Sequence, residues 1–353
     1  MPIAFPPPAF VPNHVPAVAT TEPVPAGGLA ALHELIKDFH VNVITANNTR
    51  GLDQMHLKPN VGGALEAACA FWSAPEVVVM VGFKVPIAQE GGSYSGTQET
   101  DGPLGAAMIA LACLESRRPV SVVCDHHTQA LVEACLTELS GPTAVFDVTF
   151  FSFEPGNAAR VALRCRQIAT ILTGGGRMPL IIPIETAGRT ADGIARSMRG
   201  IDITAFNPNF DQLAAELLQV KCPMLAIGDG GNELGMGAVT GVPPATNGLP
   251  MQADFAAHFV VKATVSNWGG YFLYATDKLL RGQGDQMPRV DQHDRAIGEM
   301  LRLGAVDGFT LSSDPTFISA EGRPTAVDGL PLSTHSEVWS KCLDFAQSPI
   351  QRH

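Results

Sequence analysis

The sequence is short of positive charge and of long apolar runs. Its 23 lysines and arginines stand against 34 aspartates and glutamates, which gives a formal net charge of −11. Because no basic stripe is present to neutralise phosphates, we expect neither a nucleic-acid partner nor an anionic membrane partner. No apolar run approaches the roughly 20 residues that a membrane-spanning helix needs.

Paired cysteine motifs are also missing. The seven cysteines are scattered, lie mostly in apolar contexts and include no Cys-x-x-Cys pair. We interpret them as reduced core residues of a cytoplasmic protein. The Pro-rich residues 1–28 lack the basic segment and apolar core of a secretory signal. We expect a loosely ordered arm over 1–28, lying on the domain or on a partner subunit, and a single domain over 29–353.

Short apolar runs rich in β-branched residues alternate with stretches of helical length. This alternation predicts a mostly parallel sheet covered by helices on both faces, which is a three-layer α/β sandwich. Its apolar helices make a homo-oligomer plausible. The predicted strands are 41–46, 76–83, 119–125, 143–151, 179–185, 223–229 and 258–266. The predicted helices are 29–39, 61–72, 103–116, 128–139, 157–172 and 210–220, and the segment from about 285 to 353 is expected to add helices and loops.

Polar residues gather at the ends of these predicted strands. In open parallel sheets, ligands bind in the crevice beyond the carboxyl ends of the strands. A histidine pair at a strand end is as often structural as functional, so both readings stay open for His126 and His127. The acids expected at this edge are Asp125, Asp147, Glu154, Glu185 and Asp229.

The segment 228–233, Gly-Asp-Gly-Gly-Asn-Glu, follows a predicted strand. Its glycines permit close approach of a ligand to the backbone. Asp229 and Glu233 suit a hard cation or proton transfer, and Asn232 adds a neutral oxygen or a donor. The alternative is an aspartate that caps a helix on a Gly-rich turn. The spacing does not fit the dinucleotide fingerprint and the phosphate-loop Lys-Ser/Thr is missing, so we expect no nucleotide cofactor.

This segment resembles the Gly-Asp-Gly-x-Asn-Asp metal motif of haloacid-dehalogenase-type phosphatases. Those enzymes need a nucleophilic aspartate just after the first strand and a second aspartate two residues on. Asp147-Val148-Thr149 is a faint candidate whose second acid is absent, which weakens the phosphatase reading.

Three further segments are candidate walls of a site. Residues 98–105 carry Glu99, Thr100, Asp101 and Gly102 before a predicted helix, where capping alone would explain Thr100 and Asp101. The Gly/Ser-rich loop over 82–98 is expected to be flexible and to suit a lid. Residues 185–202 place two arginines near acids, a pattern that suits a carboxylate ligand, or else a solvated ion-paired loop. Residues 266–271, Ser-Asn-Trp-Gly-Gly-Tyr, follow another strand.

Taken together, five segments resemble the D-glutamate cyclase family, in the form of its cyclase-like C-terminal domain. They are ETDGPLGA (99–106), ETAGRTADG (185–193) continuing to MRGID (198–202), IGDGGNELGMG (227–237), SNWGGY (266–271) and GAVDG (304–308). The resemblance implies conversion of D-glutamate to 5-oxo-D-proline and water. It suggests site roles for Glu99, Asp101, Glu185, Arg189, Asp229, Asn232 and Glu233. The sequence departs from the family pattern at Ile194–Ser197, in the long 85–98 loop and in the Pro-rich arm, which affects the expected substrate more than the expected fold.

Lactam formation requires removal of an ammonium proton, neutralisation of a carboxylate and protonation of a leaving oxygen. We expect Glu99, Asp101, Glu185, Asp229 and Glu233 to be catalytic. We expect the substrate, a small amino acid or its lactam, to be bound by Thr100, Gly102, Arg189, Asp192, Arg199, Gly230, Gly231, Asn232, Asn267 and Trp268. A divalent metal, Mg²⁺ or Mn²⁺, held by Asp229, Glu233 and Asp101 would relieve the repulsion between these acids. The alternatives are a non-enzymatic small-molecule sensor and a metal-dependent phosphatase-like hydrolase.

Overall fold

A parallel six-stranded sheet forms the centre of the molecule. The computed structural model describes residues 26–46, 50–89, 92–141, 144–309 and 326–349. The strand order is β10-β8-β7-β2-β5-β6, and all neighbours pair in parallel. The strands are β2 (Val77–Gly82), β5 (Val120–Cys124), β6 (Val148–Ser152), β7 (Leu180–Thr186), β8 (Leu225–Gly228) and β10 (Phe259–Lys262).

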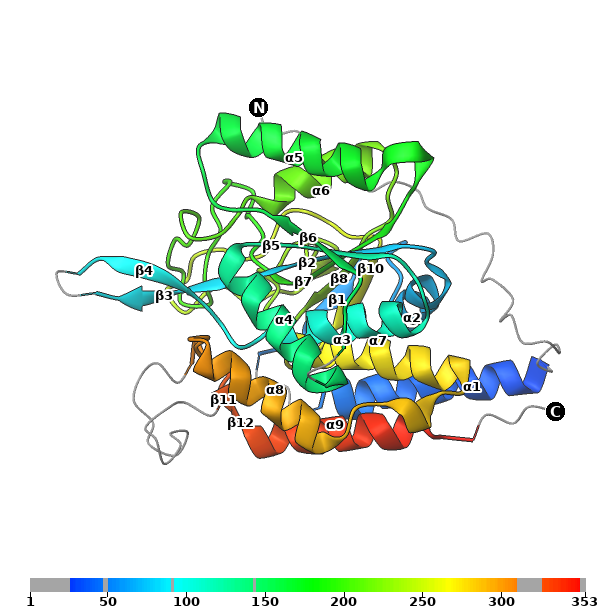
Figure 1. The fold of residues 1–353 in the computed structure, drawn as a ribbon. Helices are drawn as coiled ribbons and strands as arrows, with labels where there is room; N and C mark the ends of the chain where they lie inside the picture. The colour runs from blue at the N-terminus through cyan, green and yellow to red at the C-terminus, as the bar shows by residue number, and fades with distance from the viewer. Residues whose placement is uncertain (1–25, 47–49, 90–91, 142–143, 310–325, 350–353) are drawn as a thin grey trace.

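Helices cover both faces of this sheet (Figure 1), which confirms the predicted three-layer α/β sandwich. The helices α5 (Ala158–Leu172) and α6 (Phe210–Gln219) lie on one face. On the other lie α2 (Ala64–Ser73), α3 (Pro103–Glu115), α4 (His126–Ser140) and α7 (Ser266–Arg281). A further layer of α1 (Ala26–Phe39), α8 (Val290–Arg302) and α9 (Leu332–Ala346) lies outside them.

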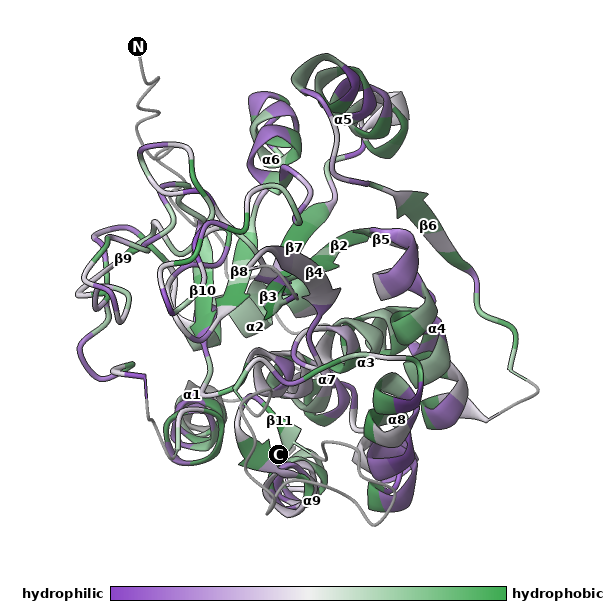
Figure 2. Ribbon diagram, turned by 90° about the vertical axis from the view of Figure 1, so that its left-hand side faces the viewer, coloured by the Kyte–Doolittle hydropathy of each residue, from purple (hydrophilic) through white to green (hydrophobic). Residues whose placement is uncertain are grey.

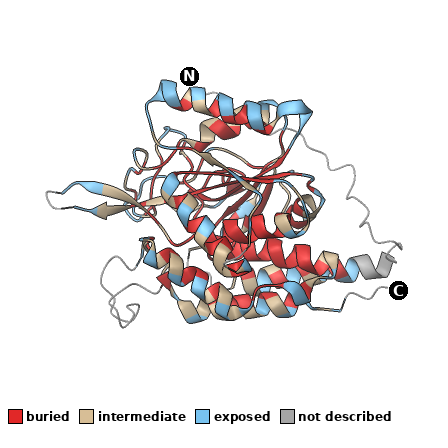
Figure 3. Ribbon diagram, in the orientation of Figure 1, coloured by how far each residue is buried: buried red, intermediate tan, exposed pale blue. Residues whose placement is uncertain are grey.

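The strands are apolar on both sides because both sides are covered. Val77, Val79 and Val81 of β2 belong to the core shared with α3 and α7, whereas Val78 and Met80 belong to the core shared with α5 and α6. Figure 2 shows the matching pattern of apolar strands and helices with polar residues on their outer faces. In Figure 3, α3 and α7 are buried along nearly their whole length, since the outer helices cover them. Within the described ranges, no helix has both the length and the apolar character needed to cross a bilayer.

Three small antiparallel pairs lie outside the main sheet. They are β1 (His56–Leu57) with β9 (Val239–Thr240), β3 (Lys84–Ala88) with β4 (Tyr94–Gln98), and β11 (Ala326–Val327) with β12 (Leu330–Pro331). The β3–β4 pair projects from the body of the molecule (Figure 1) and leads directly into the segment that carries Glu99. The prediction of a flexible loop over 82–98 is therefore wrong for residues 84–88 and 94–98, which form a hairpin.

Most predicted elements are confirmed, and the errors lie where the pattern was ambiguous. The strand predicted over 41–46 is wrong, because His40–Ile44 form a π-helical turn that continues α1. The wall predicted over 266–271 is the first turns of α7, a helix that the glycines at 269 and 270 concealed. A Cβ on Gly270 would lie 2.5 Å from the Cα of Gly105, so close packing of α7 against α3 requires glycine there. Most of the predicted 1–28 arm lies outside the described residues, and the single-domain limits 29–353 stay a prediction.

Candidate active site

Six carboxylates gather at the carboxyl edge of the sheet, as expected for a parallel α/β fold. Asp101, Asp229 and Asp328 bring carboxylate oxygens within 4.8 Å of one another, and so do Glu185, Asp229 and Glu233. Glu99 is electrostatically coupled to Asp101, Glu185 and Asp229. We call these six residues, Glu99, Asp101, Glu185, Asp229, Glu233 and Asp328, the acidic cluster.

A backbone irregularity aims Glu185 into the cluster. Val81 pairs with Ile184 and Gly82 with Thr186, so Glu185 is the extra residue of a bulge in β7 and has φ 40°. Positive φ is costly for a residue with a Cβ and often marks a functional position. The Oε2 atom of Glu185 is buried and has no hydrogen-bond partner. Gly102 packs against this side chain: a Cβ there would lie 2.8 Å from the Glu185 Cβ.

Glu233 organises the Gly-rich loop that carries Asp229. Its carboxylate accepts hydrogen bonds from the backbone N–H groups of Asp229, Gly230 and Gly231, at 2.7, 2.6 and 2.7 Å. A Cβ on Gly228 would lie 2.8 Å from the Glu233 carboxylate, so the loop wraps this group too closely for a larger residue. The glycines therefore let the backbone enclose Glu233, while the Oδ2 atom of Asp229 is buried and unpartnered.

Asp101 and Asn267 join the first turns of α3 and α7. Asp101 accepts hydrogen bonds from the N–H groups of Ser266 and Asn267, at 2.8 and 2.7 Å. The amide of Asn267 accepts from the N–H groups of Gly102 and Gly105 and donates to the Thr100 carbonyl. Asp101 thus caps α7 and faces Asp229 at the same time.

Arg50 is the functional candidate that sequence reasoning missed. Its guanidinium group bridges Asp229 and Asp328, and its side chain is only 10% exposed. Asp328 lies at φ 53° in the Asp-Gly turn between β11 and β12. An Asp-Gly pair between apolar residues is a hairpin signal that could have located this turn. No local pattern around Arg50 indicated its role.

Burial raises the pKa values of five members of the cluster. It raises the pKa of Asp229 to about 6, although Arg50 acts in the opposite direction. Burial and the neighbouring Asp229 raise the pKa of Glu233 to about 7. The pKa values of Glu99, Asp101 and Glu185 are also raised, first by burial. Near neutral pH, the cluster can therefore both accept and donate protons.

Sequence comparison agrees with the geometry. A family model described as "D-glutamate cyclase-like, C-terminal" matches residues 42–342. The chain belongs to this family. The human protein "D-glutamate cyclase, mitochondrial" is 26% identical over 337 residues, which cover 85% of this chain and 50% of that protein. The D-glutamate cyclase-like chain thus spans about half the length of that relative, and the resemblance seen in its motifs is confirmed.

Several predicted binding residues of the D-glutamate cyclase-like site have side chains that bond to other groups of the chain. The Arg189 guanidinium donates to the Gly193 carbonyl, and Asp192 is exposed and pairs with Arg196 at 2.6 Å. Arg199 is exposed and donates to the carbonyl of Gly308, a residue adjacent to Glu99. The indole N–H of Trp268 meets His335 in the helical layer. The Asn232 side chain donates to the Arg196 carbonyl.

The acids and histidines of the other strand ends take structural or peripheral positions. Asp125 caps α4, His126 is exposed beside Glu154, and the His127 ring contacts the Leu303 carbonyl. Asp147 precedes β6 and so lies at the amino edge of the sheet. The expectation that Asp147 converges with Asp229 is wrong, because strand β6 begins only at Val148.

Two oxygens in the cluster remain available to a cation or a ligand. The oxygens of Glu233 are taken by three backbone amides, and one oxygen of Asp229 contacts Arg50. The unpartnered oxygens are Oε2 of Glu185 and Oδ2 of Asp229. Carboxylate oxygens suit Mg²⁺ or Mn²⁺. The residues present therefore fit a divalent cation at Asp229, with Asp101 or Glu185 as a second ligand.

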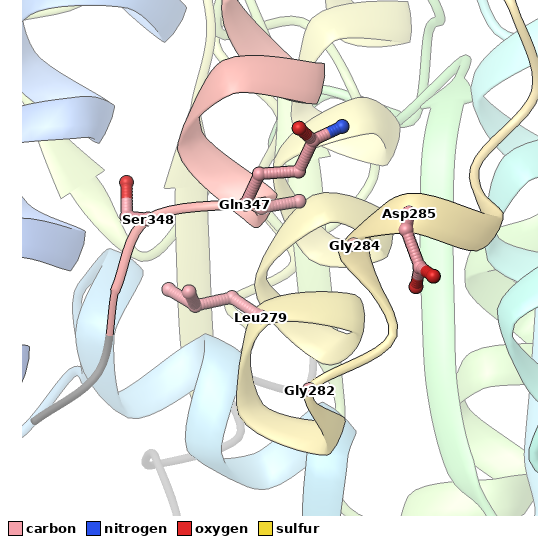
Figure 4. Close-up of a pocket in the computed structure, with 7 residues that line it drawn as sticks. Leu279, Gly282, Gly284, Asp285, Gln347 and Ser348 are labelled. Carbon is pink, nitrogen blue, oxygen red and sulfur yellow. The ribbon is translucent and has the colours of Figure 1, made fainter. Parts of the chain in front are cut away.

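Two other cavities contain none of the clustered acids. One of about 240 Å³ lies between the ends of α7 and α9 and is lined by residues including Leu279, Gly284 and Gln347 (Figure 4). The other, of about 420 Å³, is lined by residues before β2, β5 and β7, including Glu76, Arg118 and Arg177. Arg177 and Arg118 are already engaged with Glu76 and Asp277, respectively.

Proposed function

We propose that the chain is a lyase that converts D-glutamate, or a related small amino acid, to 5-oxo-D-proline and water. Family membership supports this reaction class. The observation that carries the proposal is the pair of unpartnered buried oxygens on Glu185 and Asp229. Carboxylate oxygens of these two residues lie within 4.8 Å of each other, and a buried oxygen that accepts no hydrogen bond matches an ammonium donor.

The residues would serve the reaction as follows. The substrate ammonium group loses one proton to Glu185, and the freed amine attacks the γ-carboxyl carbon. A C–N bond forms, a C–O bond breaks, and the departing oxygen leaves as water with the two protons that the nitrogen has lost. Glu99 lies beside Glu185, and its raised pKa suits a group that donates a proton to the departing oxygen.

A bound Mg²⁺ or Mn²⁺ is part of the proposal. Asp229 would hold it with its unpartnered oxygen, Asp101 is close enough to contribute, and the unpartnered oxygen of Glu185 is left to the ammonium group. A cation in that position would neutralise negative charge on the substrate carboxylate. Glu233, which we expected as a ligand, is better placed to fix the loop, since its oxygens accept three amides.

The test is a product assay on purified protein. We expect 5-oxoproline from D-glutamate and none from L-glutamate, with activity lost after chelation and restored by Mg²⁺ or Mn²⁺. Glu185→Gln keeps the size of the side chain and should abolish product. Product from neither isomer, with ligand-induced thermal stabilisation alone, would favour a small-molecule sensor instead.

A phosphatase-like hydrolase is the weaker alternative. Its nucleophile candidate, Asp147, precedes β6, while Asp229 follows β8 at the opposite edge of the sheet. If the protein hydrolysed a generic aryl phosphate and Asp147→Asn did not reduce the rate, the protein would be a phosphatase with a nucleophile other than Asp147.

We infer that the protein works in a reducing compartment such as the cytoplasm. All seven cysteines are free, and six are buried. Burial raises the pKa of Cys113 to about 12, which keeps that thiol protonated and unreactive. Fractionation of cells that express the full-length protein tests the cytoplasmic location.

A further inference from the structure

The acidic cluster contains one buried cation, and its environment is unusual for a structural ion pair. Arg50 contacts Asp229 through one terminal nitrogen and Asp328 through the other. The Phe309 ring lies 4.8 Å from the guanidinium carbon. Glu185, Asp101 and Glu99 also act on its charge. One cation therefore interacts with several carboxylates, whereas a buried structural ion pair requires only one carboxylate.

Two acids that contact Arg50 come from different parts of the fold. Asp229 follows β8 in the central sheet, whereas Asp328 comes from the short β11–β12 hairpin at the far end of the chain. A guanidinium group offers a planar fork that binds a carboxylate through two parallel hydrogen bonds. In the structure one terminal nitrogen of this fork contacts Asp229 and the other contacts Asp328.

We propose that Arg50 is the residue that binds the γ-carboxylate of the substrate, and that Asp328 occupies this position until the substrate displaces it. The substrate identity in this inference rests on the proposed function. The unpartnered oxygen of Asp229 belongs to the carboxylate that Arg50 contacts, so ammonium and carboxylate ends would meet on either side of Asp229. Arg50 would also stabilise the negative charge that develops on the carboxyl oxygen.

The test measures binding of glutarate, a dicarboxylate that has no amine and cannot form the lactam. Calorimetry on the full chain should give saturable binding of glutarate and none of its uncharged diamide. Arg50→Gln should weaken glutarate binding by about 30-fold, since hydrogen bonds to a charged group are lost. Arg50→Lys keeps the charge without the fork and should weaken it by about tenfold. If Arg50→Gln does not fold, the glutarate affinity of Arg50→Lys tests the inference instead.

Asp328→Asn is the matched control. It removes the same ion pair from the other side, and asparagine tolerates the positive φ of this turn. If Arg50 only closes a structural ion pair, both variants should lose glutarate equally. We expect Asp328→Asn to bind glutarate at least as tightly as the wild type, because a competing acceptor is gone. Equal loss in both variants, unchanged binding in Arg50→Gln, or no binding to the wild type would overturn the inference.

The outcome is independent of turnover. Glutarate binding that depends on Arg50, without 5-oxoproline formation, would support Arg50 as a carboxylate site and reject the proposed reaction. Product formation together with glutarate binding that does not depend on Arg50 would support the proposed reaction and reject Arg50 as the carboxylate site.

Discussion

Two buried polar clusters in this protein differ in charge balance. In the first, between α3 and α7, Asp277 pairs with Arg118 at 2.9 Å and with Arg281 at 2.8 Å, and Lys278 pairs with Glu115 at 2.9 Å. Both oxygens of Asp277 are hydrogen-bonded. We call these five residues the paired cluster.

The acidic cluster at the sheet edge is unbalanced by comparison. Arg50 pairs with two of its six carboxylates, and two buried oxygens of the cluster have no hydrogen-bond partner. Burying a charge costs stability unless a partner compensates for it. In the paired cluster, side chains of the protein compensate the buried charges. In the acidic cluster, protons or a ligand must compensate the remaining negative charge. The difference separates structural from functional charge in this fold.

The largest expected effect is on turnover in the acidic cluster. Asp229→Asn should lower kcat by about 10²- to 10³-fold, because an oxygen that faces the reacting groups loses its charge. The melting temperature should change by only a few degrees, since Arg50 keeps Asp328 as a partner. Steady-state kinetics and calorimetric melting measure the two effects. Unfolding of this variant would mean that Asp229 is structural, and the distinction between the clusters would then fail.

The paired cluster should show the opposite pattern. Asp277→Ala removes the buried carboxylate that Arg118 and Arg281 share and should cost about 3 kcal/mol of unfolding free energy. Arg281 is a quarter exposed, so this value lies at the low end for a buried pair. Denaturant unfolding gives the free energy, and kcat of the folded fraction should stay within about twofold. A large loss of kcat at full folding would count against a purely structural role.

The pH dependence of stability should distinguish the clusters further. The pKa of Asp229 is raised to about 6 by burial, above its value of about 4 in an unfolded chain. The unfolded state then releases the proton at lower pH than the folded state. Stabilisation from the neutral form is therefore complete below pH 4 and is lost as pH rises through 6.

Comparison of wild type with Asp229→Asn measures this contribution together with the effect of Asp229 on the pKa values of Glu233, Glu185 and Glu99. The wild type should lose about 2 kcal/mol more than the variant between pH 4 and pH 7. Buried His40 and His335, with pKa values lowered to about 4, act in the opposite sense in both proteins and cancel in the difference. Parallel curves for the two proteins would show that Asp229 is ionised throughout.

The smallest effect is expected at the predicted carboxylate clamp outside the cluster. Arg189 donates to the Gly193 carbonyl, so Arg189→Ala should raise KM by less than about threefold, as for a surface contact. Arg199→Ala is the matched comparison, because Arg199 contacts Gly308 next to Glu99. A large rise of KM in Arg189→Ala alone would restore the sequence-based assignment.

The central sheet and its covering helices were predictable because their signals are local. An apolar strand such as 76–83 and a capped helix such as 103–116 can each be recognised from the pattern of about a dozen consecutive residues. The π-helical turn after α1 was not predictable, because Val41, Val43 and Ile44 also fit a strand. Helix α7 was concealed by two glycines whose small size serves contact with α3 rather than a turn.

The candidate acids were visible in the sequence, since strand ends in a parallel sheet lie at one edge. Their individual tasks were not visible. Glu233 could equally have been a metal ligand, and only the folded loop turns three backbone amides toward it. The bulge that aims Glu185 depends on the register between β7 and β2, which no single segment encodes.

The sequence by itself thus determined the α/β sandwich, the family and the edge of the sheet where the acids meet, because periodicity and short motifs specify these locally. Tertiary structure alone decided that Arg50 and Asp328 join the site and that Asp147 does not. Contacts between residues far apart along the chain depend on how the layers pack, and that packing is a property of the whole fold.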